Sequence, residues 1–252
     1  MTGMTDRRVA LLTGVGRAGS IAHGVAPVLA ADGWDLALVG SAAYDAEAGY
    51  GGDADDVAAL AVEIGAAGGR VLRLDADLAD PDVPARLVAD TVAGLGRVDA
   101  LVLSHSQSTD SSILDTTVGS WDRHVAVNAR AAWLLIRAFA ETEPADGRIV
   151  AFTSDHVVHN LPYGASKGAL DRVVLAAAGE LGSRGIVANV INPGPVDTGW
   201  MDDATRAALT ALQPSGRLGT PRDAAHLVRF LLSPEGGWIT GQLLTSDGGF
   251  SI

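Results

Sequence analysis

The chain has 252 residues, of which 48% are hydrophobic, and this suits one large α/β domain with a sizeable core. Its 30 acidic and 18 basic residues give a formal net charge of −12, and no basic run is present, so nucleic acid is not an expected partner. The absence of cysteine excludes disulfides and thiolate metal sites, and we expect no metal. Because no long apolar run and no signal-peptide core occur, we expect no membrane span and a cytoplasmic location.

Short apolar runs alternate along the chain with longer segments of helical period. The expected strands are 9–14, 35–40, 70–74, 99–104, 148–154, 186–191 and 242–247. The expected helices are 20–32, 56–68, 83–96, 120–140, 164–183 and 221–233. Most of the strands lack polar/apolar alternation, which indicates a parallel sheet covered on both faces. The pattern predicts a single doubly wound Rossmann fold over 1–252, with about seven parallel strands and with ligands at the switch point between the first and fourth strands.

A glycine-rich segment, Gly14 to Gly19, follows the first strand and has the form G-x-G-x-x-G. The next residue, Ser20, could cap the helix that follows. In this context the backbone can approach a pyrophosphate, and the helix N-terminus offers N–H donors. The alternative is a tight turn without a ligand.

A tyrosine and a lysine, Tyr163 and Lys167, lie four residues apart on one expected helical face. Lys167 is the only lysine, whereas the chain has 17 arginines. Since arginine serves every other cationic position, a retained lysine suggests that its compact, rotatable ammonium is required there.

With these motifs the chain resembles the short-chain dehydrogenase/reductase family over essentially its full length. Tyr163 and Lys167 match the Tyr-x-x-x-Lys motif, and Asn128 in "WDRHVAVN" matches the helix asparagine. Asp77 and Leu78 match the adenine-contacting pair after the third strand. The segments "LPYGASKGAL", "INPGPVDTGW" and "WITGQ" look most like 3-oxoacyl-(acyl-carrier-protein) reductases. The second of them includes the expected nicotinamide-lining residues Pro193, Gly194, Val196 and Thr198.

The resemblance implies a catalytic tetrad. Tyr163 would be the general acid during carbonyl reduction, or the base in the reverse direction. Lys167 would lower the tyrosine pKa and hold the nicotinamide ribose hydroxyls. Asn128 would hold a water in a proton relay, and Ser154 would donate a hydrogen bond to the substrate oxygen.

Three segments depart from the family pattern. Where the family has Asn-Asn-Ala-Gly after the fourth strand, this chain has Leu-Ser-His-Ser over 103–106, and we expect His105 to face the cleft. The loop between Ser154 and Tyr163 is short, and we expect His156 or His159 to touch the substrate. The opening loop, with "SIAHGVA", resembles the divergent enoyl-(acyl-carrier-protein) reductases instead.

The second strand bears on the choice of cofactor, because an acid at its end would hold a ribose 2′-hydroxyl and repel a 2′-phosphate. No acid follows it before Asp45, and Arg17 lies in the glycine loop, so NADP(H) is favoured over NAD(H). Ser41 could donate to the phosphate. The expected cofactor-binding residues are Gly14, Gly16, Arg17, Ser20, Ile21, Ser41, Asp77, Leu78, Ser104, His105, Tyr163, Lys167, Pro193, Gly194, Val196 and Thr198.

The expected activity is hydride transfer between NADP(H) and a small-molecule carbonyl or secondary alcohol. Two alternatives stay open, namely a redox-neutral enzyme of this fold, such as a cyclase or dehydratase, and a non-catalytic NADP-binding protein. Residues 198–217 should form a substrate lid. The apolar helices around Asn128 and after Tyr163 predict a homo-oligomer, either a tetramer or a dimer.

Overall fold

The computed structural model describes residues 7–49 and 54–252, and these build a parallel sheet. The strands are β1 (Val9–Thr13), β2 (Asp35–Gly40), β3 (Val71–Asp75), β4 (Ala100–Leu103), β5 (Gly147–Phe152), β6 (Ile186–Asn192) and β7 (Leu243–Thr245). Their spatial order is β3-β2-β1-β4-β5-β6-β7. This confirms the predicted seven-stranded, doubly wound sheet. The strand order reverses between β1 and β4, so the carboxyl ends of these two strands mark the expected ligand site.

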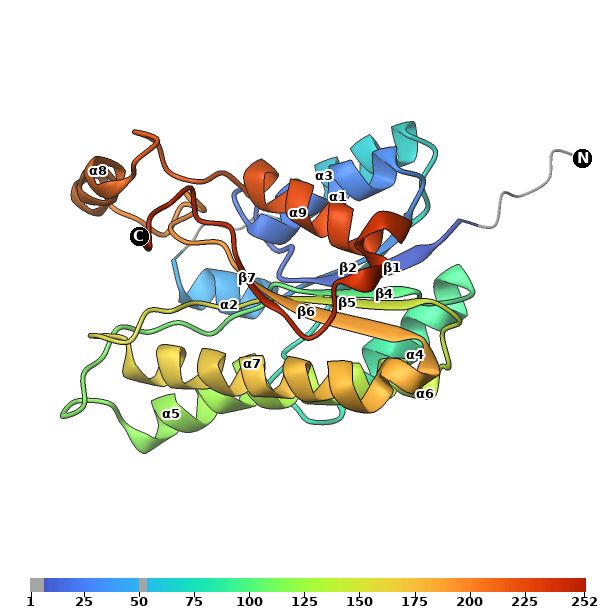
Figure 1. Ribbon diagram of the computed structural model, residues 1–252, viewed down its shortest axis with the longest axis horizontal. Helices are drawn as coiled ribbons and strands as arrows, with labels where there is room; N and C mark the ends of the chain where they lie inside the picture. Colours follow the sequence, from blue (N-terminus) through green and yellow to red (C-terminus); the bar gives the residue numbers. More distant parts are fainter. Residues whose placement is uncertain (1–6, 50–53) are drawn as a thin grey trace, which may run out of the picture.

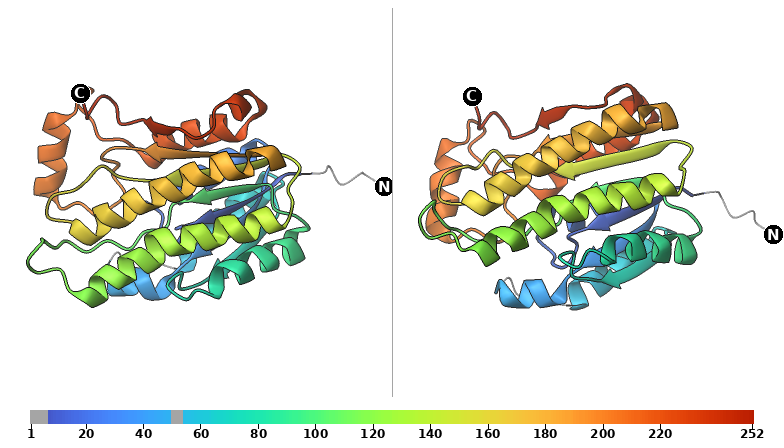
Figure 2. Two further views of the ribbon diagram at one scale, coloured as in Figure 1. Left: turned by 60° about the horizontal axis from the view of Figure 1, so that its bottom comes forward. Right: turned by 90° about the horizontal axis from the view of Figure 1, so that it is seen from below.

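Helices cover both faces of the sheet (Figure 1). On one face lie α1 (Ile21–Ala31), α3 (Ala54–Ala66) and α9 (Pro221–Leu232). On the other lie α4 (Val83–Leu95), α6 (Ala131–Glu141) and α7 (Leu161–Leu181). From below, α7 runs alongside the continuous helical stretch formed by α5 (Val118–His124), the π-helix η1 (Val125–Arg130) and α6 (Figure 2).

The central strands are buried on both faces, as their unbroken apolar runs predict. Leu11 and Leu101 pack into the core on one side of the sheet, whereas Leu12 and Val102 pack into the core on the other. Side chains that alternate along a strand point to opposite faces, so two apolar cores hold one sheet rigidly. This rigid sheet fixes the positions of the loops at its carboxyl edge.

Several elements differ from the sequence-based expectation. The expected helix 120–140 is interrupted by η1, and α7 begins at Leu161, before the expected 164. The short helix α2 (Ala42–Glu47) was not expected, nor were the 3₁₀ turns η2 (Gly182–Arg184) and η3 (Pro234–Trp238). The helix α8 (Asp203–Leu212) lies inside the expected lid segment and stands apart from the sheet layers (Figure 1).

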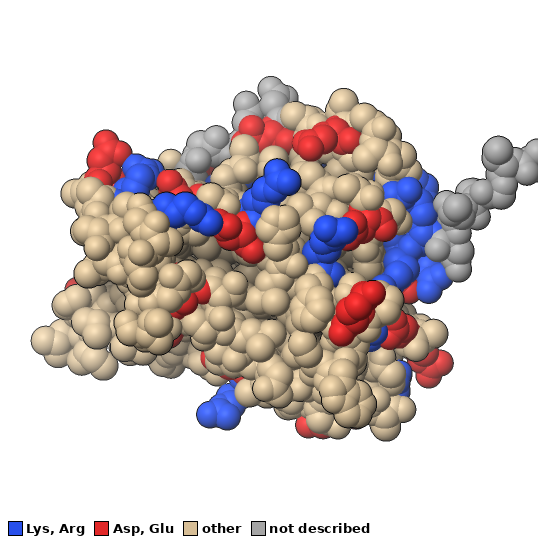
Figure 3. All heavy atoms as spheres, turned by 45° about the horizontal axis from the view of Figure 1, so that its top comes forward, with Lys and Arg blue, Asp and Glu red and all other residues tan. Residues whose placement is uncertain are grey.

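Charged side chains of both signs are interspersed over the face that carries α1 and α9 (Figure 3). Two acids on this face, Asp32 and Asp223, form ion pairs with Arg229 and Arg217 at 2.5 and 2.8 Å. The Asp32–Arg229 pair joins the end of α1 to α9, and Asp223 also forms a capping box with Thr220 at the start of α9. Among the described residues, no helix combines the length and apolar character needed to cross a membrane.

Candidate active site

The glycine loop connects β1 to α1 at the switch point. Gly14 has a φ of +81°, and a Cβ there would lie 2.9 Å from the backbone nitrogen of His105, so the loop packs directly against the end of β4. Ser20 caps α1 as expected, because its hydroxyl accepts a hydrogen bond from His23 N at 3.1 Å. The N-terminus of α1, with Ile21 as its first residue, therefore opens at the site where a pyrophosphate would bind.

The loop after β6 meets the glycine loop from the other side. A Cβ on Gly19 would lie 3.1 Å from the carbonyl oxygen of Thr198, so the two loops approach closely here. Gly194 has a φ of +61° and packs against Asp247, while Val196 is buried and pairs with Gly219. The structure thus brings together two segments, 14–21 and 193–198, that the sequence assigns to cofactor binding.

Tyr163 and Lys167 share one face of α7, which confirms the predicted spacing. Lys167 is 2% exposed, and its ammonium lies 5.7 Å from the centroid of the Tyr163 ring. It donates a hydrogen bond to the Phe152 carbonyl at 2.9 Å. Burial lowers the Lys167 pKa to about 8, and the charge of Asp171 partly opposes this shift. A cation that is costly to bury is thereby held beside a phenol, an arrangement typical of acid–base chemistry.

Asn128 lies in the π-helix and is 1% exposed. Its Oδ1 accepts from Gln107 N at 2.7 Å, and its Nδ2 donates to Gln107 O and Ser166 Oγ at 2.9 and 2.8 Å. The side chain therefore fastens the loop after β4 to α7, and one lone pair on Oδ1 is left for a water. A relay water on this side chain stays a prediction.

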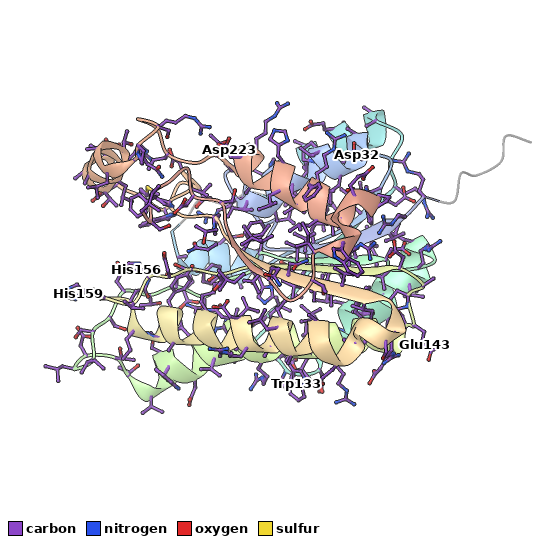
Figure 4. All side chains as sticks on the ribbon, viewed as in Figure 1. Asp32, Trp133, Glu143, His156, His159 and Asp223 are labelled. Atoms are coloured by element: carbon purple, nitrogen blue, oxygen red, sulfur yellow. The ribbon has the colours of Figure 1, made fainter. Side chains whose placement is uncertain are left out.

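Ser154 follows β5, and its hydroxyl accepts from His156 N at 3.2 Å. A hydroxyl that accepts in this way keeps its hydrogen for donation to a substrate oxygen. His156 and His159 are exposed on the loop before α7, at the end of the molecule where α8 also lies (Figure 4). His159 has a φ of +60°, and its carbonyl accepts from Ser111 N at 3.1 Å, which ties this loop to the one after β4.

His105 differs from the expectation that it faces the cleft. His105 is 8% exposed, and its ring has Nδ1 2.6 Å from Thr13 Oγ1 and Nε2 3.0 Å from Val127 O. Because a carbonyl can only accept, Nε2 carries the hydrogen and Nδ1 accepts from Thr13. Burial and the nearby charge of Lys167 lower the His105 pKa to about 3, so the ring is neutral. It joins β1 to the π-helix, and Ser104 N also donates to Thr13 Oγ1.

The adenine end of the expected site contains Asp77 and Leu78 after β3. Leu78 is buried, whereas the Asp77 carboxylate accepts from Arg123 at 2.8 Å and from Ala79 N at 2.9 Å. These bonds hold the Asp77 pKa below its usual value despite partial burial. Ser41, at the end of β2, caps α2 by accepting from Tyr44 N. All three residues lie on loops at the carboxyl edge of the sheet.

One acid near the glycine loop was missed by sequence reasoning. In the sequence, Asp45 lies beyond the end of β2. In the structure, α2 turns the chain back, and Asp45 is 7% exposed. A Cβ on Gly16 would collide with the Asp45 carboxylate. The signal that could have revealed it is the N-cap at Ser41, since a helix beginning there carries its fourth residue back towards the preceding loop.

The arrangement fits a nicotinamide dinucleotide. A glycine loop and a helix N-terminus lie at the switch point, where a pyrophosphate would find N–H donors. The Lys167 ammonium has three donors, and Phe152 O is its one hydrogen-bond acceptor in the described part of the chain. Its remaining donors could therefore serve ribose hydroxyls beside Tyr163.

Comparisons with known proteins agree with this geometry. Residues 14–251 match the family model described as Enoyl-(Acyl carrier protein) reductase. The chain is 32% identical to the uncharacterized oxidoreductase YjdA of Bacillus subtilis, covering 98% of both chains. It is 28% identical to a 3-oxoacyl-[acyl-carrier-protein] reductase of Synechocystis, covering 99% of this chain and 98% of that one. A short chain dehydrogenase from Burkholderia cenocepacia, solved in complex with NADP, superimposes with a TM-score of 0.86 at 32% identity, covering 98% of each chain.

The fold and the site define a nicotinamide-dependent oxidoreductase of the doubly wound α/β class. The chain belongs to the short-chain dehydrogenase/reductase family, whose members transfer a hydride between a nicotinamide cofactor and a carbonyl or secondary alcohol. The resemblance stated from the motifs of the sequence is thereby confirmed.

Proposed function

We propose that the protein is an NADP(H)-dependent ketoreductase that reduces a small-molecule carbonyl. The observation that carries the proposal is the buried ammonium of Lys167 beside the Tyr163 ring, at the carboxyl edge of the sheet. A protein that only binds a dinucleotide needs no proton donor next to a buried cation. This pair therefore favours catalysis over simple binding.

The tetrad residues divide the acid–base work among them. The nicotinamide supplies the hydride, and Tyr163 supplies the proton to the carbonyl oxygen. The positive charge of Lys167 beside the ring favours the phenolate form of Tyr163 and so helps the tyrosine to give up its proton. Ser154 donates to the same substrate oxygen, where negative charge develops. Asn128 holds the loop after β4 against α7 and so keeps the substrate side of the cleft in place.

The preference for NADP(H) has two supports. No acid occupies the end of β2 itself, which is Gly40, and Arg17 lies in the glycine loop. The Burkholderia neighbour was solved with NADP. An arginine near the ribose can accommodate a 2′-phosphate.

The substrate end of the site suits an apolar compound. Val157 and Val158 are exposed on the loop before α7, and Trp200 is exposed in the proposed lid, 198–217. Such side chains near the cleft would gain from contact with a ligand that excludes water. His156 and His159 would add polar contacts.

The test is a screen of NADPH oxidation against apolar ketones and 3-oxoacyl thioesters, with Tyr163→Phe as the inactive control. Tyr163-dependent oxidation with alcohol formation supports the proposal. Product formation without net cofactor oxidation would favour the redox-neutral alternative. Tight NADPH binding with no turnover on any substrate or crude metabolite extract would favour the non-catalytic one.

We also propose that the protein is one domain over 1–252 and forms a homo-oligomer, a dimer or a tetramer, in the cytoplasm. Trp121 and Trp133 are 39% and 49% exposed along the α5 to α6 stretch, and Val118 is 77% exposed. Apolar side chains gathered on adjacent helices favour association of copies through this face. Light scattering at micromolar concentration tests the proposal, and a monomer would contradict it.

A further inference from the structure

The loop after β4 is held from two sides through one residue, Gln107. Asn128 binds its backbone, because Gln107 N donates to Asn128 Oδ1 at 2.7 Å and Gln107 O accepts from Asn128 Nδ2 at 2.9 Å. Arg123 binds its side chain, because Arg123 Nε donates to Gln107 Oε1 at 3.4 Å. Arg123 lies on α5 and Asn128 on η1, which continues α5. One helical stretch therefore holds both the backbone and the side chain of Gln107.

The same arginine also reaches the loop after β3. Arg123 Nη1 donates to Asp77 Oδ2 at 2.8 Å, and a guanidinium is a planar fork that can serve two partners at once. The two side chains are 36% and 50% exposed, so the ion pair is expected to add little to the free energy of unfolding. What the pair provides is position, because it fastens the loop after β3 to the loop after β4.

Beyond Asn128 the hydrogen bonds continue to the helix that carries the acid. Asn128 Nδ2 also donates to Ser166 Oγ at 2.8 Å, and Ser166 Oγ donates to Tyr163 O at 2.8 Å. Asn128 and Ser166 are both buried. A connected series of bonds thus runs from Asp77, where the family resemblance places the adenine, to the backbone of Tyr163. Arg123 is the member that joins the adenine end of this series to the tetrad.

We propose that Arg123 is a positioning residue, which holds Gln107 against Asn128 and links that contact to occupation of the adenine end of the site. A ligand that contacts Asp77 restrains its carboxylate, and the carboxylate in turn restrains the guanidinium that binds Gln107. Order gained at one end of the series therefore favours order at the other, and the effect is reciprocal. The inference rests on the proposed binding of a nicotinamide dinucleotide but not on ketoreduction.

The amide of Gln107 gives a direct readout, because it is the group that donates to Asn128. Its hydrogen exchange is measured by NMR in the cofactor-free wild type, in Arg123→Gln and in Arg137→Gln. Arg137 is a matched control, since it is an exposed arginine of the same helical stretch and pairs with Glu141 at 3.1 Å. Arg123→Gln should speed exchange at Gln107 about fivefold, whereas Arg137→Gln should change it less than about twofold.

Adenosine 5′-monophosphate tests the link to the adenine end, because it carries the adenine and lacks the nicotinamide that would contact the tetrad. Near saturation it should slow exchange at Gln107 about threefold or more in the wild type and in Arg137→Gln. At the same fractional saturation it should leave the exchange of Gln107 in Arg123→Gln unchanged. A residue that only stabilised the fold would not remove this response to the ligand.

Equal exchange at Gln107 in the wild type and Arg123→Gln would overturn the inference, and so would a ligand response that persists in this variant. Faster exchange throughout α5 and η1 would also overturn it, because Arg123 would then only stabilise the helix. The same holds if the wild type binds NADPH but its Gln107 does not respond to the monophosphate. Arg123→Met is a second neutral variant should Arg123→Gln lower the thermal midpoint. A wild type that binds no adenine nucleotide would refute the proposed cofactor, and the ligand-free comparison would still test the hold on Gln107.

Discussion

The ammonium of Lys167 lies 5.7 Å from the centroid of the Tyr163 ring, one helical turn away on α7, and it is held there by the Phe152 carbonyl at the end of β5. The bond joins the helix that carries the acid to the central sheet. Because α7 and β5 both pack into the core, the separation between the two groups is fixed by the fold.

Lys167→Arg should nearly abolish turnover although it keeps the charge. A guanidinium is larger and planar, so in a site that is 2% exposed it would displace the tyrosine or the ribose. A displacement of about 1 Å can cost roughly 10²-fold in rate. The measurement is kcat, with NADPH affinity as the control. Retention of more than about a tenth of the activity, worth about 1.4 kcal/mol, would contradict the prediction.

Tyr163→Phe should be at least as damaging, because it removes the proton donor itself. Loss of a placed acid typically costs about 10² to 10⁴ in rate. The fold and cofactor binding should be retained, since the ring stays in place, and thermal midpoint and cofactor titration check this. Substantial activity in this variant would mean that another group protonates the substrate.

Lys167→Met should stabilise the cofactor-free protein at neutral pH. Burial lowers the Lys167 pKa from 10.5 to about 8, so the folded state binds fewer protons than the unfolded state between these values. The free-energy cost of burying the charged ammonium is at its full value below about pH 8, and it decreases as the pH rises towards 10.5. The free energy of unfolding should therefore increase with pH across that window. Its removal should raise the free energy of unfolding by roughly 1 to 3 kcal/mol at pH 7.

Urea unfolding at pH 7, 9 and 10 measures this effect as the difference between the wild type and Lys167→Met. The extra free energy of unfolding of Lys167→Met over the wild type should become smaller as the pH rises. If this difference did not change with pH, or if Lys167→Met were less stable than the wild type at pH 7, interactions around the ammonium would have to offset the cost of its burial.

His105→Ala should lower both stability and kcat. It removes the bonds to Thr13 Oγ1 and Val127 O, and although Thr13 keeps its bond from Ser104 N, we expect a loss of stability of about 1 to 3 kcal/mol. Val127 precedes Asn128 in the π-helix, so its displacement should reach the tetrad and reduce kcat about tenfold, a factor of about 1.4 kcal/mol. His105→Gln, which can donate and accept, should recover part of both. If His105→Ala lowered stability but left kcat unchanged, His105 would have only a structural role.

His156→Ala and His159→Ala should each raise KM with little change in kcat. Both side chains are exposed on the loop before α7, whereas Lys167 is buried and Tyr163 is partly buried. A loss of ground-state contacts shows in KM, and a loss of transition-state contacts shows in kcat. If kcat fell strongly at constant KM, one of these histidines would have to take part in proton transfer.

Elements governed by local pattern were predictable from the sequence. The apolar runs gave the strands of the sheet, and the spacing of Tyr163 and Lys167 gave their common face on α7. The Ser20 cap was also predicted. In each case the deciding interactions lie within a few residues.

Features that depend on tertiary contacts were not predictable. The π-helix at Asn128 replaces a regular turn, and bonds from this residue to Gln107 and Ser166 accompany it. The inward turn of His105 depends on Thr13 and Val127, which are far away in sequence. The return of Asp45 to Gly16 depends on the packing of α2. None of these contacts leaves a periodic signal in the sequence.

The single lysine also gives the chain an unusual response to a lysine-specific protease. Such a protease has one peptide bond to cut, the one after Lys167, and it would leave fragments of residues 1–167 and 168–252. That bond lies inside α7, with its lysine side chain 2% exposed, so cleavage requires α7 to open. The rate of this one cut therefore reports the local unfolding of the helix that carries Tyr163, and a bound dinucleotide that holds the lysine should slow it.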